Sequence, residues 1–449
     1  MGNGLDPASR SGPPRPHVLG RLFQAGDSRQ NAARLRRGVF LILAVCGLLT
    51  LSRQVRHLSV PSVYLKDIKQ EYLLARAVLD GENPYALQPA LAERYLPAVT
   101  PYVLPHPVPH PPFVAVLATP LGLVSYETAC AVWLGLELML LLVVVWSIAV
   151  SHEHSRSPAC VLAAFCILLL WPPVAAGLLY GQLSTALAAL LIGCWLAFRG
   201  GRQRLAGLLL GVSVAVKLIP VAIAGYFLVK RQWRVVLWSV GTCAACWAIG
   251  ILALGGDAVR TYLVDGLSSA AYYRGYEGNY SVVGAVYRVF AGNPSLAPLV
   301  DLEWAAGPLS TLAALAVLCV AAVAVARADD PDAEFSLALC AMLLASPLTW
   351  LHYFTVLVWP LWVLARRVHA AGWEPWHANQ LLLVMVMLSA APGLVAIPVV
   401  LFGRLLAADV TQGPLPGVAG LPFLALIVGP GLLFWMLVTE LRRVRRSEG

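Results

Sequence analysis

Two acids follow the first long apolar run of the chain at a spacing that suits proton transfer. Asp67 and Glu71 lie four residues apart in the segment 63–72, so a helix there places both carboxyl groups on one face. A carboxylate held beside aromatic side chains is suited to removing a proton from an acceptor hydroxyl. The spacing leaves open an ordinary solvated acid, paired with Lys66 or Lys69. The spacing makes this pair of acids a candidate for proton abstraction.

A single lysine stands close to a proline inside an apolar stretch. Lys217 lies in the run 215–220, which ends in Pro220, so a cation and a helix-breaking residue fall at one place. A lysine there is costly in lipid and must face protein, water or an anion. A lipid phosphate is the commonest anion at that depth, and snorkelling to the membrane interface is the alternative. We predict that Lys217 binds a phosphate.

A third polar group occupies a similar break. Trp350 and His352 lie in the short run 346–353 and could hold a phosphate or a sugar. A histidine near an aromatic belt often has a structural role, which is the competing interpretation. Glu137 lies inside another apolar run, where an acid needs a basic or hydroxyl partner. The sequence does not identify that partner.

The proline-rich run 101–113 contains two histidines but is too irregular for a metal site. His110 could still reach an active site, and a rigid-loop role is the alternative. Neither GxxxxGKS/T nor HExxH occurs, which disfavours ATP-driven transport and zincin proteolysis. All nine cysteines lie in or beside apolar runs, which indicates core packing rather than disulfides or zinc binding. We therefore expect no metal and no cofactor.

The composition defines the environment of these residues. Of 449 residues, 59% are hydrophobic and 12% are charged, whereas soluble domains are roughly half apolar and about a quarter charged. Apolar runs recur from Val39 to Val438, which indicates an integral membrane protein and excludes an ordinary cytosolic enzyme. The net charge of +9 comes from short basic clusters between these runs, so it indicates topology and not nucleic-acid binding.

The basic clusters predict which loops are cytoplasmic. These clusters lie at 34–37, 152–156, 199–204, 230–234, 366–369 and 442–446. Returning the chain to the cytoplasm at each one predicts about twelve transmembrane helices with both termini inside. The expected spans are 38–54, 127–150, 158–177, 182–198, a pair within 205–229, 235–254, 305–327, a pair within 335–366, 379–402 and 420–440. They form one transmembrane domain at 37–441, between a disordered cytoplasmic tail at 1–36 and a basic tail at 442–449.

Two of these segments are too short for two complete spans, which need roughly 40 residues. The stretches 205–229 and 335–366 therefore predict broken or re-entrant hairpins, with tips near Lys217 and His352 toward the non-cytoplasmic side. Two long polar segments, 53–112 and 255–304, fall on that side as well. We expect an external catalytic face over a membrane base.

Taken in order, these segments resemble glycosyltransferase family 87, whose members are polytopic GT-C enzymes. The resemblance covers about residues 38–440. The residues that carry it are Asp67; 77–85; 111–113 with Pro120 and Leu121; Gly181 and Gln182; Lys217 with Pro220 and 231–234; 278–281 with Gly284 and Arg288; and Ser346, Pro347, Trp350 and His352.

The resemblance implies an all-α membrane glycosyltransferase that needs no metal. It implies inverting transfer of a sugar, with mannose the leading candidate, from a polyprenyl-phosphate donor to a hydroxyl of a lipid or glycan acceptor. The implied location is a bacterial plasma membrane, with the active site on the extracytoplasmic side, membrane lipids as further partners and no nucleic acid.

The implied residue roles extend the candidates above. Asp67 is the general base, and Lys217 binds the departing phosphate, which cations can stabilise without a metal. His352 and Arg288 assist Lys217, and the residues that position sugar or acceptor are Gln182, Asn279 and Trp350. Leu183 and Ser184 follow Gln182, and Tyr353 stands where the family often has a second histidine. These departures leave the sugar and the acceptor open.

Two other classes of protein remain. A transporter or lipid flippase would use charged groups and broken helices near the midplane, as Glu137 and Lys217 would provide. Most polar residues nevertheless lie in the two external segments, which a carrier does not need. An assembly subunit without chemistry predicts that Asp67→Asn has no effect.

Overall fold

The structure is a computed structural model that describes residues 25–151, 157–294, 296–372, 374–389 and 427–448. These residues form helices and loops and contain no β-strand, which confirms the predicted all-α class. The α-helices are α1 (Ala25–Arg56), α2 (Lys69–Leu79), α3 (Gln88–Tyr95), α4 (Pro112–Ala118), α5 (Tyr126–Val150), α6 (Pro158–Leu170), α7 (Pro172–Tyr180), α8 (Ser184–Arg199), α9 (Gln203–Val216), α10 (Val221–Val229), α11 (Trp233–Thr261), α12 (Leu267–Ser269), α13 (Val282–Phe290), α14 (Glu303–Ala326), α15 (Pro331–Ala345), α16 (Val358–Ala370), 375–389 and α19 (Val428–Glu448). Short 3₁₀ or π turns lie at Ser62–Leu65, Pro97–Tyr102, Thr119–Leu123, Tyr262–Gly266, Ala270–Tyr273 and Leu351–Leu357.

The described helices are those of a polytopic membrane protein. Four, namely α1, α5, α11 and α14, are long and apolar enough to cross a bilayer, and α6 with α7 adds a fifth candidate bent by 72°. Large apolar side chains point outward, with Leu48 65% exposed and Leu252 85% exposed, as expected of surfaces that face lipid. Much of the predicted span 379–402 lies outside the described residues, and the total of about twelve spans stays a prediction.

Helix α1 extends beyond the first apolar run toward the N-terminus. It begins at Ala25, so residues 25–36 are helical, and the predicted domain bounds stay a prediction. The physical reason is composition, because alanine, glutamine and arginine in this stretch are good helix formers and extend the apolar helix behind them. The rest of the predicted tail lies outside the described residues.

Helices α9 and α10 form the first predicted hairpin. The chain on each side of it binds the first turn of α15, since Arg199 at the end of α8 lies 3.0 Å from Asp332 and Lys230 after α10 lies 3.0 Å from Glu334. Helix α9 ends at Val216, and the chain extends at Lys217 before α10 begins. The hairpin predicted within 205–229 is confirmed, and its break falls at Lys217.

Close helix packing fixes the position of that break. Gly207 and Gly211, four residues apart on α9, face α11 so closely that an added Cβ would lie 2.7 Å from the carbonyl oxygen of Val235 and 2.5 Å from that of Ser239. Small residues at this spacing let membrane helices approach each other. Helix α11 therefore supports α9 along the length that leads to Lys217.

The second hairpin consists of α15, the 3₁₀ turn Leu351–Leu357 and α16. Arg367 at the end of α16 pairs with Asp330 just before α15, so the hairpin also returns to the end of the bundle from which it starts. At its tip Tyr353 meets the first hairpin, because the Lys217 ammonium lies 3.7 Å from the centre of the Tyr353 ring. The two predicted tips are therefore in contact.

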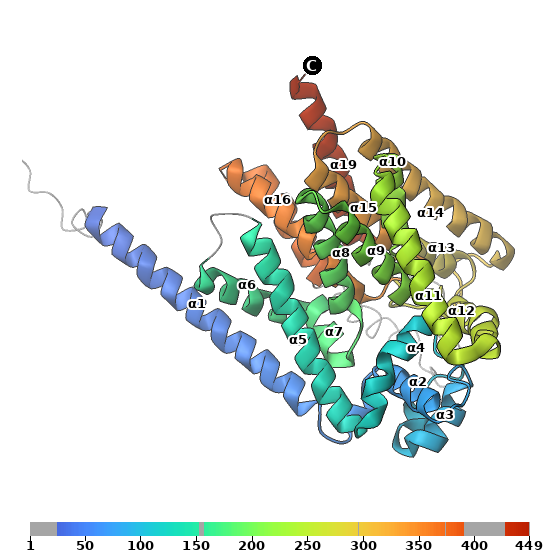
Figure 1. Cartoon of the computed structure of the whole chain (residues 1–449). Helices are drawn as coiled ribbons and strands as arrows, with labels where there is room; N and C mark the ends of the chain where they lie inside the picture. The colour runs from blue at the N-terminus through green and yellow to red at the C-terminus, as the bar shows by residue number, and fades with distance from the viewer. Residues whose placement is uncertain (1–24, 152–156, 295, 373, 390–426, 449) are drawn as a thin grey trace, which may run out of the picture.

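The two long polar segments also come together. Asn83 donates a hydrogen bond to Thr261, and His106 Nε2 lies 2.7 Å from the Tyr273 hydroxyl. Figure 1 shows α2, α3 and α4 gathered at one end of the bundle, close to α12 at the foot of α11. Two segments that are far apart in sequence thus build one polar layer next to the hairpin tips.

Candidate functional site

Asp67 lies where the first polar segment meets the end of α7. Its backbone N–H donates to the Tyr180 carbonyl at 2.8 Å, and its carboxylate Oδ2 accepts from the Gln182 side-chain amide at 2.7 Å. Lys69 Nζ lies 3.8 Å from Oδ1, and the Asp67 side chain remains 36% exposed. The carboxylate is therefore held from two sides and still reachable by another molecule.

The surroundings of Asp67 raise its pKa above the ordinary aspartate value, and burial is the main cause. The ammonium of Lys69 and the hydrogen bond from Gln182 lower the pKa, while the neighbouring Glu71 carboxylate raises it. Because a carboxylate with a higher pKa takes up a proton more readily, this environment suits a general base.

Glu71 shares the site but is already paired. Its side chain is buried, and one carboxylate oxygen lies 2.9 Å from His110 Nδ1. His110 therefore lies beside the acids. Of the two acids predicted to share a helical face, Asp67 is the one left accessible.

Lys217 lies within electrostatic reach of both acids, whose charges act on its ammonium group. It follows the last residue of α9, where the negative end of a helix favours a cation. Within the described part of the chain the Lys217 ammonium forms no ion pair or hydrogen bond, and its contact is the face of the Tyr353 ring. The geometry leaves this ammonium available for an anion.

His352 and Trp350 flank the same region. His352 is buried, with 7% of its surface exposed. Its Nε2 has no hydrogen-bond partner among the described residues, and the charge of Lys217 acts on the ring. Trp350 packs edge-on against Tyr273 and Tyr276 of the second polar segment, with ring centres 6.0 and 6.4 Å apart. Direct contact of either residue with a substrate stays a prediction.

Asn279 and Arg288 occupy a different environment, inside the second polar segment. The Asn279 side chain is fully buried and donates to the carbonyls of Arg274 and Pro347 while accepting from Ser281 and Thr349. Arg288, 2% exposed, donates to the carbonyls of Tyr276 and Asn279. Both residues support the loop beneath Trp350, and their predicted contact with sugar or phosphate stays a prediction.

The structure adds residues that the sequence interpretation missed. The Tyr353 ring faces the Lys217 ammonium. The hydrogen-bonded pair His106–Tyr273 links the two polar segments, and Tyr273 lies close enough to Asp67 for the charge of that acid to act on it. The sequence positions of Tyr353 and His106 could have indicated a role in the site, since Tyr353 directly follows His352 and His106 lies in the same proline-rich run as His110. In the described ranges no group of three or more His, Cys, Asp or Glu side chains is placed to hold a metal ion.

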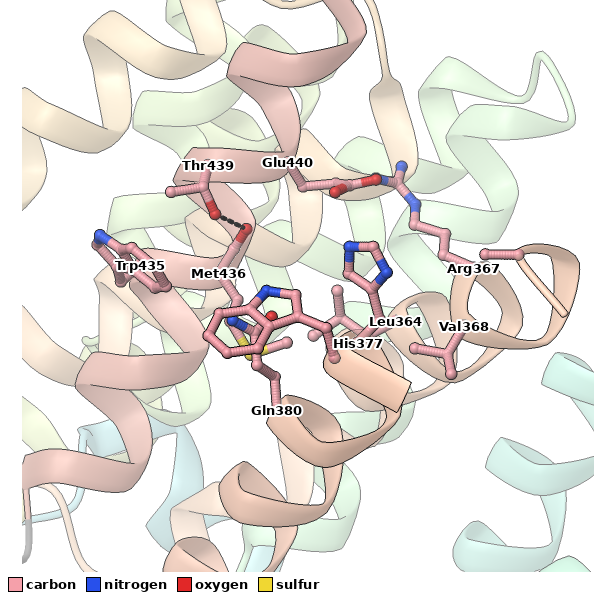
Figure 2. Close-up of a pocket in the computed structure, with 11 residues that line it drawn as sticks. Leu364, Arg367, Val368, His377, Gln380, Trp435, Met436, Thr439 and Glu440 are labelled. Atoms are coloured by element: carbon pink, nitrogen blue, oxygen red, sulfur yellow. Dashed lines mark hydrogen bonds and ion pairs between the residues drawn. The ribbon is translucent and has the colours of Figure 1, made fainter. Parts of the chain in front are cut away.

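A cavity of about 370 Å³ lies elsewhere, among α16, the helix 375–389 and α19. Figure 2 shows Arg367 beside Glu440, with His377 and Trp435 around the cavity. Arg367 is 3.2 Å from Glu440 and also pairs with Asp330, so it ties three helices together at the end of α15 opposite to the hairpin tip. None of the candidate site residues lines this cavity.

The model of glycosyltransferase family 87 matches residues 109–347, more than half of the chain. The chain belongs to glycosyltransferase family 87. Gln182, Lys217, Asn279 and Arg288 lie inside the matched segment, whereas Asp67 lies before it.

Curated relatives of this family 87 chain come from mycobacteria. One from Mycolicibacterium smegmatis is a polyprenol-phosphate-mannose-dependent alpha-(1-2)-phosphatidylinositol pentamannoside mannosyltransferase, 29% identical over 63% of this chain and 68% of that protein. A protein of the same description from Mycobacterium tuberculosis is 28% identical over 55% of this chain and 56% of its own length. A Mycobacterium tuberculosis mannosyltransferase described as acting on phosphatidylinositol mannoside is 25% identical over 73% of this chain and 74% of that protein.

Gly181 gives a prediction about how this family 87 site is assembled. It ends α7 in the left-handed conformation at φ +68°, and an added Cβ would lie 3.2 Å from the Cβ of Ile68. We expect Gly181→Ala to destabilise the protein by about 1–2 kcal/mol through backbone strain and to displace Gln182 from Asp67. Thermal unfolding in detergent and transfer activity should both fall. Gly225→Ala on α10, where no atom lies within 4 Å of the added Cβ, is the control and should lower neither.

Proposed function

We propose that this protein is a membrane mannosyltransferase that uses a polyprenyl-phosphate mannose donor. It transfers the sugar to a hydroxyl of a lipid or glycan acceptor on the non-cytoplasmic face, with inversion. The donor chemistry of the three mannosyltransferases described above supports this proposal. The observation that supports the mechanism is that the Asp67 carboxylate is accessible and that the Lys217 ammonium, which lies over the Tyr353 ring, is within electrostatic reach of it.

In the proposed reaction the acceptor oxygen attacks the anomeric carbon of the sugar. The bond from that carbon to the phosphate oxygen breaks, its electron pair leaves with the polyprenyl phosphate, and the hydroxyl proton passes to Asp67. Lys217 stabilises the negative charge that develops on the departing phosphate. Gln182 holds the carboxylate in place for proton transfer. This single displacement needs one base and one cationic group, and it inverts the anomeric configuration.

The direct test uses purified protein in detergent with labelled polyprenyl-phosphate mannose and a phosphatidylinositol mannoside as acceptor. The proposal expects label to move into the acceptor while polyprenyl phosphate is released in equal amount. Label that stays on the donor, with no glycosidic bond formed, would overturn it. Movement of the labelled donor across a proteoliposome membrane without transfer would support the transporter alternative.

Lys69 provides a prediction about pH. Activity requires the Asp67 carboxylate, so it is present above the pKa of this group and is lost as pH falls through it. Because Lys69 lowers this pKa, Lys69→Met should raise it and move the acidic limb of kcat/KM to higher pH. The control Arg94→Gln removes an exposed charge that pairs with Glu82 in the same polar segment and should leave the limb in place. An unchanged limb in Lys69→Met would contradict the assignment of that limb to Asp67.

A further inference from the structure

Lys66, directly before the candidate base, does not point to Asp67. Its side chain is buried, and Nζ donates to the carbonyl of Leu179 at 2.7 Å and to that of Leu178 at 3.3 Å. These carbonyls belong to the last turn of α7, where backbone oxygens have no partner within the helix. A lysine at this position satisfies them and also complements the negative end of the helix dipole.

The contacts of the next two residues complete the same junction. The backbone N–H groups of Asp67 and Ile68 both donate to the Tyr180 carbonyl, at 2.8 and 3.3 Å. Residues 66–68 thus donate hydrogen bonds to three successive carbonyls at the end of α7, those of residues 178–180. The chain then turns at Gly181, and Gln182 returns to the Asp67 carboxylate. The position of the base relative to its hydrogen-bond partner depends on this capped end.

Glu137 lies on α5, the helix whose Tyr126 hydroxyl donates to the Lys66 carbonyl at 3.4 Å. It is 2% exposed, and neither carboxylate oxygen has a hydrogen-bond partner among the described residues. The charges of Glu137 and Lys66 act on each other, and Cys130, also on α5, is the other titratable group that acts on Lys66. Trp133, one turn before Glu137, approaches Gly181, so α5 packs against this junction. A buried acid in a transmembrane helix requires such a cationic neighbour.

We propose that Lys66 is a positioning residue for Asp67, and that Glu137, buried on the helix that packs against this junction, favours the ammonium form of Lys66 at the end of α7. This inference rests on the proposed function, in which Asp67 is the base. An ammonium group has three protons to donate, so it can hold both carbonyls at once. Without it, the carbonyls of Leu178 and Leu179 lose their partner while the backbone bonds to Tyr180 remain, so the junction shifts and the carboxylate moves relative to the acceptor hydroxyl.

The first experiment compares Lys66→Met with Lys66→Arg in purified protein. A displacement of about 1 Å at a reacting group can cost about 100-fold in rate, so we expect kcat per donor-binding site to fall about 10- to 100-fold in Lys66→Met. KM for donor and acceptor should stay the same, and Lys66→Arg should restore part of the rate. Unlike Lys69→Met, Lys66→Met should leave the acidic limb in place. Wild-type kcat in Lys66→Met would overturn the proposal.

The second experiment measures kcat for Glu137→Gln alone and for the double variant with Lys66→Met. If Glu137 acts through Lys66, Glu137→Gln lowers kcat severalfold by itself and adds nothing to Lys66→Met. Effects that multiply would show independent roles and contradict the pairing. If the Lys66→Met protein does not accumulate, the same comparison of single and double variants is made with Lys66→Arg, and its result tests the pairing. Asp67→Asn is measured in parallel, because full activity there refutes the proposed function, whereas an inactive Asp67→Asn with normal Lys66 variants refutes this inference alone.

Discussion

Asp67→Asn is expected to lower kcat by about 10²- to 10⁴-fold, the range typical of a lost general base. Asparagine keeps the size of the side chain and can still bond to Gln182, but it cannot accept the proton of the acceptor hydroxyl. The backbone contacts to Tyr180 remain, so the protein should fold and bind the donor normally. The measurement is steady-state transfer from polyprenyl-phosphate mannose, with donor binding measured on the same preparation.

A matched variant separates the two acids of the site. Glu71 is buried and paired with His110, so Glu71→Gln should act mainly on the position of that histidine and reduce the rate less than Asp67→Asn does. Transfer by Asp67→Asn at the wild-type rate would remove the base assignment and leave the assembly-subunit alternative standing.

Lys217→Met should produce the second largest loss, about 10²- to 10³-fold in kcat, because one group that stabilises transition-state charge is typically worth this much. Methionine preserves much of the apolar stem beside Tyr353 and removes only the ammonium. The loss should appear in kcat and in kcat/KM for the donor, while KM for the acceptor stays unchanged. Initial rates with both substrates varied measure these constants separately.

The control for Lys217→Met is Arg202→Gln, which removes an exposed cation from the loop before α9 without altering the hairpin tip. It should behave as wild type. Donor kinetics that are normal in Lys217→Met would mean that the lysine merely reaches for the membrane interface, the alternative that the sequence left open.

Chain length and charge placement made the hairpins predictable. The 25 residues between Arg204 and Lys230 are too few for two spans, and the structure breaks the helix at Lys217 as that limit requires. The contact between the two tips was not predictable, because the pairing of Lys217 with Tyr353 depends on how α9 packs against α11 through its glycines.

Side-chain direction was the main limit within the site. Lys66, Lys69 and Asp67 are neighbours in sequence, yet Lys69 approaches the acid while Lys66 caps α7, which the sequence could not distinguish. Asn279 has its hydrogen bonds satisfied by its own loop and by the backbone of Pro347 and Thr349, and a sequence motif does not reveal whether an amide is already satisfied. Glu137 required a partner on physical grounds, but only the fold shows that its helix α5 packs against the junction at Lys66.

The anomeric configuration of the transferred sugar tests the central claim most directly, because that claim is a single displacement with one base and one cationic group. Nuclear magnetic resonance of the anomeric proton in the donor and in the product of the purified wild-type protein measures it. The account predicts opposite configurations in the two compounds. Retention of the donor configuration would require a second displacement and would contradict the roles given to Asp67 and Lys217.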